Sequence, residues 1–144
     1  MKNYFITWTG GVCFLFTGLL CQAQHNGTLT IKATHFDHAN GVAVVQLYRE
    51  QDDIPEKPFM KSTGAIVKLE STFTLSNLPY GEYAIILFHD ENLNGILDHK
   101  FGFPNEPMCF SNEWSLSLFS GMPTFKKLKF VFTADRSTQE VKLK

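Results

Sequence analysis

Alternation of apolar and polar residues with a period of two recurs from residue 29 to the end of the chain. The segment 29–34 alternates Leu, Ile and Ala with Thr and Lys, and 128–132 alternates Leu and Phe with Lys and Val. Successive side chains of a β-strand point to opposite faces, so this pattern is typical of strands with one buried face. Segments 42–48 and 82–88 are apolar at nearly every position, which indicates central strands buried on both faces.

Further alternating segments, and the turn signals between them, complete the fold prediction. The pattern returns in 66–70, 72–75 and 140–144, and no segment after residue 24 shows a sustained helical period. About seven strands in one domain predict an all-β fold, an antiparallel β-sandwich of the immunoglobulin-like or prealbumin-like kind. Turns are expected at Asn40-Gly41, 51–58, Glu70-Ser71, 78–81 and 134–137.

The first residues have the pattern of a secretory signal peptide. Lys2 supplies a positive charge, the stretch 4–20 is uncharged and largely apolar, and Cys21-Gln22-Ala23 offers a small-x-small cleavage site. We therefore expect a signal peptide over 1–23 and a single domain over 24–144, without a transmembrane span. The mature protein would be exported to the periplasm, the cell surface or the medium. An uncleaved anchor and a lipid-modified Cys21 remain alternatives.

The charge and the cysteine content limit the possible partners and the possible cross-links. Thirteen basic and fourteen acidic side chains give a formal net charge of −1, and no long basic stripe is present. A nucleic-acid partner is therefore not expected. Cleavage after Ala23 would leave Cys109 as the single cysteine, which excludes an internal disulfide. Free cysteine is among the most buried residue types, so Cys109 is expected in the core rather than as a nucleophile.

The most specific chemical signal is an acidic loop over 90–98. The loop matches the first part of the EF-hand pattern D-x-[DN]-x-[DN]-G, in which alternate side chains and a backbone carbonyl turn inward around calcium. Gly95 stands at the sixth position, where the loop bends sharply. The predicted ligands are the side-chain oxygens of Asp90, Asn92, Asn94 and Asp98 and the backbone carbonyl of Ile96, whose side chain would face the core.

The match to an EF-hand loop is incomplete. Phe101 stands at the twelfth position, where a full EF-hand has a bidentate glutamate. Calcium would therefore bind weakly, with a Kd of roughly 10⁻⁴–10⁻³ M, in a structural role. The alternative is a plain turn, because Asn94-Gly95 suits a type I′ hairpin and Asp and Asn side chains cap backbone groups.

The connection from residue 90 to 123 is far longer than the usual ~4–6 residues between elements. It contains Phe101, Phe103, Trp114 and Phe119 as candidates for an exposed ligand surface. The partner would be a protein, a glycan or a small ligand. The alternative is that these aromatic side chains extend the core. We expect an irregular strand or a short helical turn in 112–119.

A metal-dependent hydrolase is the alternative function. No G-x-S-x-G, H-E-x-x-H or phosphate-binding loop is present, which argues against an enzyme. Zinc binding needs three or four ligands of the N, S or O type. A hydrolase would require that at least three side chains converge on one cleft from the set His35, His38, His89, His99, Asp90 and Asp98.

Four motifs in order, LPYGEYA at 78–84, HDENLNGILD at 89–98, FSN at 110–112 and GMPTF at 121–125, carry a resemblance to a known family. The chain resembles an exported bacterial family known as a domain of unknown function, DUF2141, over about 29–143. The turn motif also resembles that of prealbumin-like sandwiches. Tyr80 replaces a proline of the family pattern, and Cys109 stands where glycine is usual. The resemblance implies export, a β-sandwich and a meaningful 90–98 loop, but no established activity or cofactor.

Overall fold

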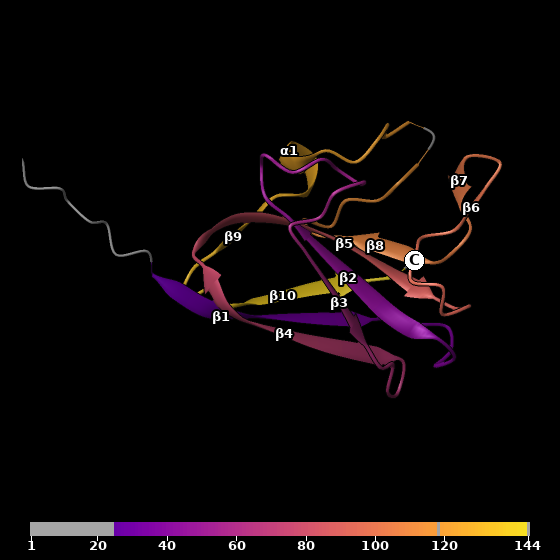
Figure 1. Cartoon of the computed structure of the whole chain (residues 1–144), viewed down its shortest axis with the longest axis horizontal. Helices are drawn as coiled ribbons and strands as arrows, with labels where there is room; N and C mark the ends of the chain where they lie inside the picture. The colour runs from indigo at the N-terminus through magenta and orange to yellow at the C-terminus, as the bar shows by residue number, and fades with distance from the viewer. Residues whose placement is uncertain (1–24, 118, 144) are drawn as a thin grey trace, which may run out of the picture.

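The computed structural model describes residues 25–117 and 119–143, and the predicted signal peptide lies outside these residues. Two sheets form the body of the protein (Figure 1). The smaller sheet has the order β10-β1-β4, formed by Thr138–Lys142, Asn26–Thr34 and Glu70–Pro79. The larger sheet has the order β3-β2-β5-β8, formed by Met60–Gly64, Val42–Tyr48, Gly81–Asp90 and Met108–Phe110, and β9 (Phe130–Phe132) also pairs with β5.

Three short elements complete the described chain. The strands β6 (His99–Lys100) and β7 (Phe103–Pro104) form a small hairpin at one end of the molecule, and α1 (Phe125–Leu128) precedes β9 (Figure 1). No helix among the described residues is long and apolar enough to cross a membrane. The all-β prediction is confirmed.

The main core lies between the two sheets. The period-two pattern places the apolar side chains of β1 and β4 on one face, and that face packs on β2 and β5. The cluster includes Leu29, Ile31, Phe73, Leu75, Val45, Leu47, Ile85, Leu87, Cys109, Phe132 and Val141. Cys109 is 4% exposed, as expected from its residue type.

A second cluster covers the outer face of the larger sheet. Tyr48, Ala84, Ile86 and Phe110 point away from the main core and pack under Leu128 of α1. The loop after β2 and the segment after β8 add Ile54, Trp114 and Phe125 to this layer. The apolar composition of 42–48 and 82–88 is explained by burial on both faces.

The structure differs from the predicted elements at several places. The turn expected at Glu70-Ser71 lies two residues earlier, at Lys68 and Leu69, which have φ of +53° and +63°. Ser71 is buried inside β4, and β3 over Met60–Gly64 was not predicted. The smaller sheet is mixed, because β1 pairs with β10 in parallel. The described residues of 112–119 contain no strand or helix, and α1 follows them instead.

Candidate functional site

The acidic loop begins where β5 ends, on a carboxylate that lies under the loop. Asp90 is 1% exposed, and its Oδ1 and Oδ2 accept hydrogen bonds from the backbone N–H groups of Asn94 (3.2 Å) and Gly95 (2.8 Å). Gly95 has a φ of +77°, which L-residues other than glycine rarely adopt. The loop therefore folds back over the Asp90 side chain.

The polar side chains of the loop turn toward one another. The Asp98 carboxylate accepts hydrogen bonds from the side-chain amides of Asn92 (2.5 Å) and Asn94 (3.0 and 3.1 Å). The amide oxygens accept in turn from backbone N–H groups, Asn92 from Asn94 (3.0 Å) and Asn94 from Ile96 (2.8 Å). The loop is thus closed by its own hydrogen bonds, in the manner of Asx turns.

The Ile96 side chain does not face the core. It is 61% exposed, so the expectation that it ties the loop to the sandwich is wrong. The loop is instead attached through polar groups, among them the Lys61 ammonium of β3, which donates to the Gly95 carbonyl oxygen.

Glu106 is a further acidic residue of this region that the sequence pattern did not indicate. Its carboxylate is nearly buried, at 6% exposure, and accepts from the backbone N–H groups of Glu91 (3.1 Å) and Asp98 (3.3 Å). One carboxylate therefore holds both ends of the loop together. Glu106 lies outside the nine-residue motif, and only the path of the chain through β6 and β7 returns it to the loop.

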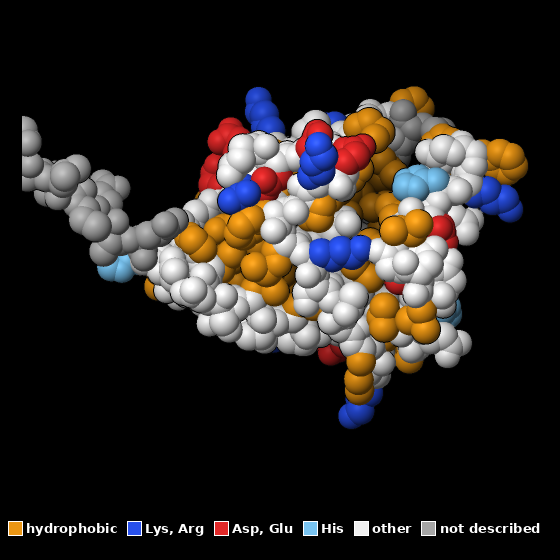
Figure 2. Space-filling model, viewed as in Figure 1, with side chains coloured by type: hydrophobic (Ala, Val, Ile, Leu, Met, Phe, Trp, Pro, Cys, Tyr) orange, Lys and Arg blue, Asp and Glu red, His pale blue; other side chains and the backbone are white. Residues whose placement is uncertain are grey.

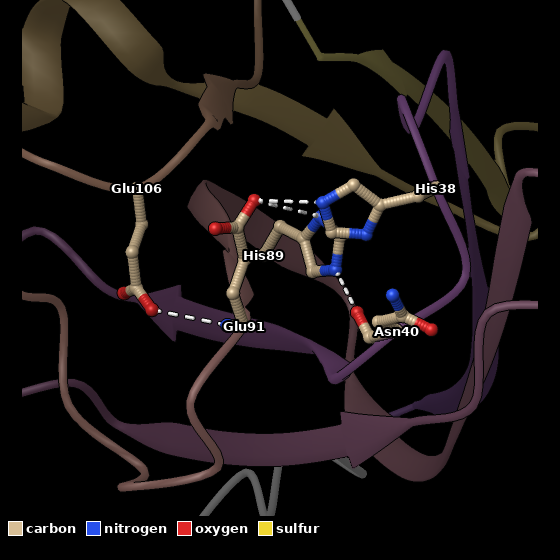
Figure 3. A network of polar contacts seen from close by, with 5 residues as sticks. All are labelled: His38, Asn40, His89, Glu91 and Glu106. Atoms are coloured by element: carbon tan, nitrogen blue, oxygen red, sulfur yellow. Dashed lines mark hydrogen bonds and ion pairs between the residues drawn. The ribbon is translucent and has the colours of Figure 1, made fainter.

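Beside the loop, a histidine pair meets a glutamate (Figure 3). His89 lies in β5 and is fully buried, whereas His38 comes from the loop between β1 and β2. Glu91 Oε1 lies 3.2 Å from His38 Nε2 and 4.0 Å from His89 Nδ1. Ligand atoms of these three residues all lie within 4.8 Å of one another.

The backbone around this cluster is closely packed. His89 Nε2 lies 2.5 Å from the carbonyl oxygen of Asn40, in the turn predicted at Asn40-Gly41. Gly41 has a φ of +85°, and a Cβ there would lie 2.3 Å from the Asp90 carbonyl oxygen. Phe36 packs edge-on against the His89 ring, with centroids 5.3 Å apart.

The cluster differs from the set of side chains that the hydrolase alternative requires. Two of its members, His38 and His89, belong to that set, and the third, Glu91, does not. His35 and His99 lie outside this group, and His35 contacts the Thr34 hydroxyl instead (2.8 Å). The sequence did not indicate Glu91 as the third member, although it lies two residues after His89.

Three of the four candidate ligand-surface aromatics are well exposed. Phe101, Phe103 and Phe119 are 92%, 59% and 99% exposed, and hydrophobic side chains are visible at the tip of the β6–β7 hairpin (Figure 2). Trp114 is half-buried and packs edge-on against Phe110, with ring centroids 4.7 Å apart.

A pocket of about 900 Å³ lies beside these aromatic residues. Phe103 and Trp114 line it, together with Glu106 and Leu116, whereas Phe101 and Phe119 lie outside its lining. Burial raises the pKa of the Cys109 thiol, which also borders the pocket, to about 12. Cys109 is therefore protonated at neutral pH and unsuited to act as a nucleophile.

Comparison with known proteins identifies a family. No curated protein and no solved structure matches the chain significantly. The model of the bacterial family DUF2141, described as "uncharacterized protein conserved in bacteria", matches residues 31–140. The match spans most of the sandwich and of the pocket lining, together with the acidic loop and the histidine cluster, and it agrees with the resemblance carried by the four motifs. The chain therefore belongs to the DUF2141 family.

Proposed function

We propose that this protein is an exported binding module in which the 90–98 loop holds calcium weakly, and in which the adjoining pocket receives a ligand. The observation that carries the proposal is the cluster of polar side chains within the loop. The side-chain amides of Asn92 and Asn94 donate to the Asp98 carboxylate, the Asp90 carboxylate accepts from a backbone N–H group of the same loop, and Glu106 accepts from the N–H groups of Glu91 and Asp98. A hard cation prefers such oxygen ligands.

Calcium would act on the structure rather than as a signal. Its ligands would be Asp90, Asn92, Asn94, the Ile96 carbonyl and Asp98, with the two asparagine amides rotated so that their oxygens face the ion. If the Kd were about 0.1 mM, calcium at about 1 mM would stabilise the fold by ~1.4 kcal/mol. The loop lies directly before the β6–β7 hairpin, so an ion there would order one wall of the pocket.

Thermal unfolding tests the calcium proposal. The wild-type melting temperature should rise by roughly 4–7 °C between excess chelator and about 1 mM calcium. Asp98→Asn should abolish the calcium-dependent rise, because it removes a carboxylate ligand. The matched control is Asp135→Asn, which changes an exposed aspartate in a turn elsewhere and should keep the rise. Equal melting temperatures of the wild type with chelator and with calcium would refute the proposal.

The ligand-binding part of the proposal rests on the pocket and its aromatic rim. A volume of about 900 Å³ lies within the range of small-molecule sites, and Phe103 and Trp114 offer apolar contact area. A small apolar ligand, an apolar side chain of a partner protein or a glycan ring fits this chemistry. Binding of a hydrophobic fluorescent dye should weaken in Trp114→Ala and persist in Phe119→Ala. Equal loss in both variants would argue against the pocket.

Export is proposed from the N-terminal segment alone. Cell fractionation and mass spectrometry of the purified protein should show a mature chain that begins at Gln24, outside the cytoplasm. A cytoplasmic chain that retains Met1 would contradict export. A mature chain that begins at a lipid-modified Cys21 would favour the lipoprotein alternative.

A further inference from the structure

We propose that His38, His89 and Glu91 form a binding site for a divalent transition metal of the zinc class, with side chains other than those proposed to bind calcium. The three side chains come from the β1–β2 loop, from β5 and from the residue that follows β5. Figure 3 shows their polar ends directed at one another. The proposal does not rest on calcium binding, because none of the three supplies a side chain to the loop ligands.

The environment of His89 fixes which of its nitrogens can bind a metal. Nε2 lies 2.5 Å from the Asn40 carbonyl oxygen, and a carbonyl only accepts, so Nε2 carries the hydrogen. In the neutral imidazole, Nδ1 then carries the lone pair, and it faces Glu91. Metal-bound histidines usually donate their other ring N–H to such a carbonyl, which orients the ring.

The Nδ1 atom of His89 requires a partner that the described protein atoms do not supply. It is fully buried and has no hydrogen-bond partner among them. Glu91 Oε1 lies 4.0 Å away, too far for a hydrogen bond. His89 Nδ1 and Glu91 Oε1 thus lie opposite each other without a hydrogen between them, and a cation bound between them would give both atoms a partner.

The spacing of the three ligand atoms suits zinc. Zinc bonds to nitrogen and oxygen ligands at about 2.0–2.2 Å, so tetrahedral ligands lie about 3.4 Å apart. The distances from Glu91 Oε1 to His38 Nε2 (3.2 Å) and to His89 Nδ1 (4.0 Å) lie on either side of this value. The ligand atoms of His38 and His89 also lie within 4.8 Å of each other, so shifts of about 1 Å would complete three corners of a tetrahedron.

The ligand types separate this site from the calcium loop. Two imidazole nitrogens and one carboxylate favour zinc and neighbouring transition metals, whereas calcium takes six to eight oxygens. The His38 and Glu91 side chains are 43% and 42% exposed, so water or a partner's side chain can reach a fourth position. On zinc binding, the hydrogen on His38 Nε2 would leave or move to Nδ1, which also has no hydrogen-bond partner among the described atoms.

Zinc titration of the full, tag-free chain tests the proposal. Metal-stripped protein should bind one zinc ion per chain in calorimetry, and added millimolar calcium should not displace it. His38→Ala and Glu91→Gln should each weaken binding at least tenfold. Both residues are partly exposed, so the fold should persist, which circular dichroism can verify. His99→Ala, an exposed histidine outside the cluster, is the matched control and should bind as the wild type does.

A rescue variant distinguishes metal ligation from a structural role. His38→Cys restores a zinc ligand at the same position, so it should recover affinity that His38→Ala loses. Cobalt should give the intense visible bands of a tetrahedral ion with the wild type and lose them with Glu91→Gln. Absence of saturable zinc binding by the wild type would overturn the proposal. Unchanged binding in both His38→Ala and Glu91→Gln would do the same, and would leave a surface ion pair as the role of the cluster.

Discussion

Glu106→Gln tests whether one buried carboxylate holds the acidic loop on the sandwich. The two carboxylate oxygens of Glu106 accept separate backbone N–H groups, Oε1 from Glu91 at 3.1 Å and Oε2 from Asp98 at 3.3 Å. Glutamine has the same shape but only one oxygen. Whichever way the amide turns, its NH₂ group meets a backbone N–H, so one buried donor loses its acceptor.

The magnitude follows from these contacts. A hydrogen bond to a charged group contributes about 1.5–3 kcal/mol, and an unsatisfied buried donor costs a similar amount. We therefore expect Glu106→Gln to lower the free energy of unfolding by about 1.5–3 kcal/mol. For a chain of this size, the melting temperature should fall by roughly 5–15 °C.

Urea unfolding at neutral pH, with chelator present, measures this loss without any contribution from calcium. The matched control is Glu140→Gln on β10, where the glutamate is exposed. The control should change stability by no more than about 0.5 kcal/mol. If Glu106→Gln and Glu140→Gln unfolded at the same urea concentration, Glu106 would not anchor the loop.

Three further predictions concern the framework of the site. Ser111→Ala should lower stability by about 1–3 kcal/mol in urea unfolding, because the Ser111 hydroxyl accepts from the buried Ile85 N–H at 2.8 Å; Ser115→Ala, on an exposed segment, is the control. Gly41→Ala should cost more than about 2 kcal/mol by the same assay, because its positive φ and the nearby Asp90 carbonyl leave no room for a Cβ; wild-type stability would contradict this. The native thiol of Cys109 has its pKa raised from 9.0 to about 12, so its contribution to stability is present below pH 9 and falls as the pH rises toward 12; the stability difference from Cys109→Ala should shrink over that range.

Local sequence patterns were sufficient to predict the main strands. The segment 42–48 is apolar at nearly every position because β2 carries side chains of both cores, Val45 in one and Tyr48 in the other. The turn near residue 70 was misplaced because Lys68 and Leu69 are poor candidates for positive φ, yet both adopt it. In β4, the buried Ser71 and Phe73 alternate with exposed residues, so the pattern is equally compatible with one strand that begins at Glu70.

The candidate sites were predictable only where they are local. Asn94 donates to Asp98 and Gly95 donates to Asp90 within the same short loop, so the spacing of the motif is enough to bring these groups together. Glu106 reaches the loop, and His38 reaches the histidine cluster, only through the tertiary structure. No spacing rule links either residue to residue 90. The proximity of Asn40-Gly41 to Asp90 likewise depends on β2 pairing with β5, a contact between segments distant in sequence.

The parallel pairing of β1 with β10 has a consequence for the order in which this protein can fold. The register joins Thr30 to Thr138, so the middle strand of this sheet lies far in sequence from one of its two partner strands. Without β10, one hydrogen-bonding edge of β1 has no partner strand among the described residues, and the main core lacks Val141. The pairing of β10 with β1 is therefore a long-range step of folding, and deletion of β10 should leave an aggregation-prone remainder.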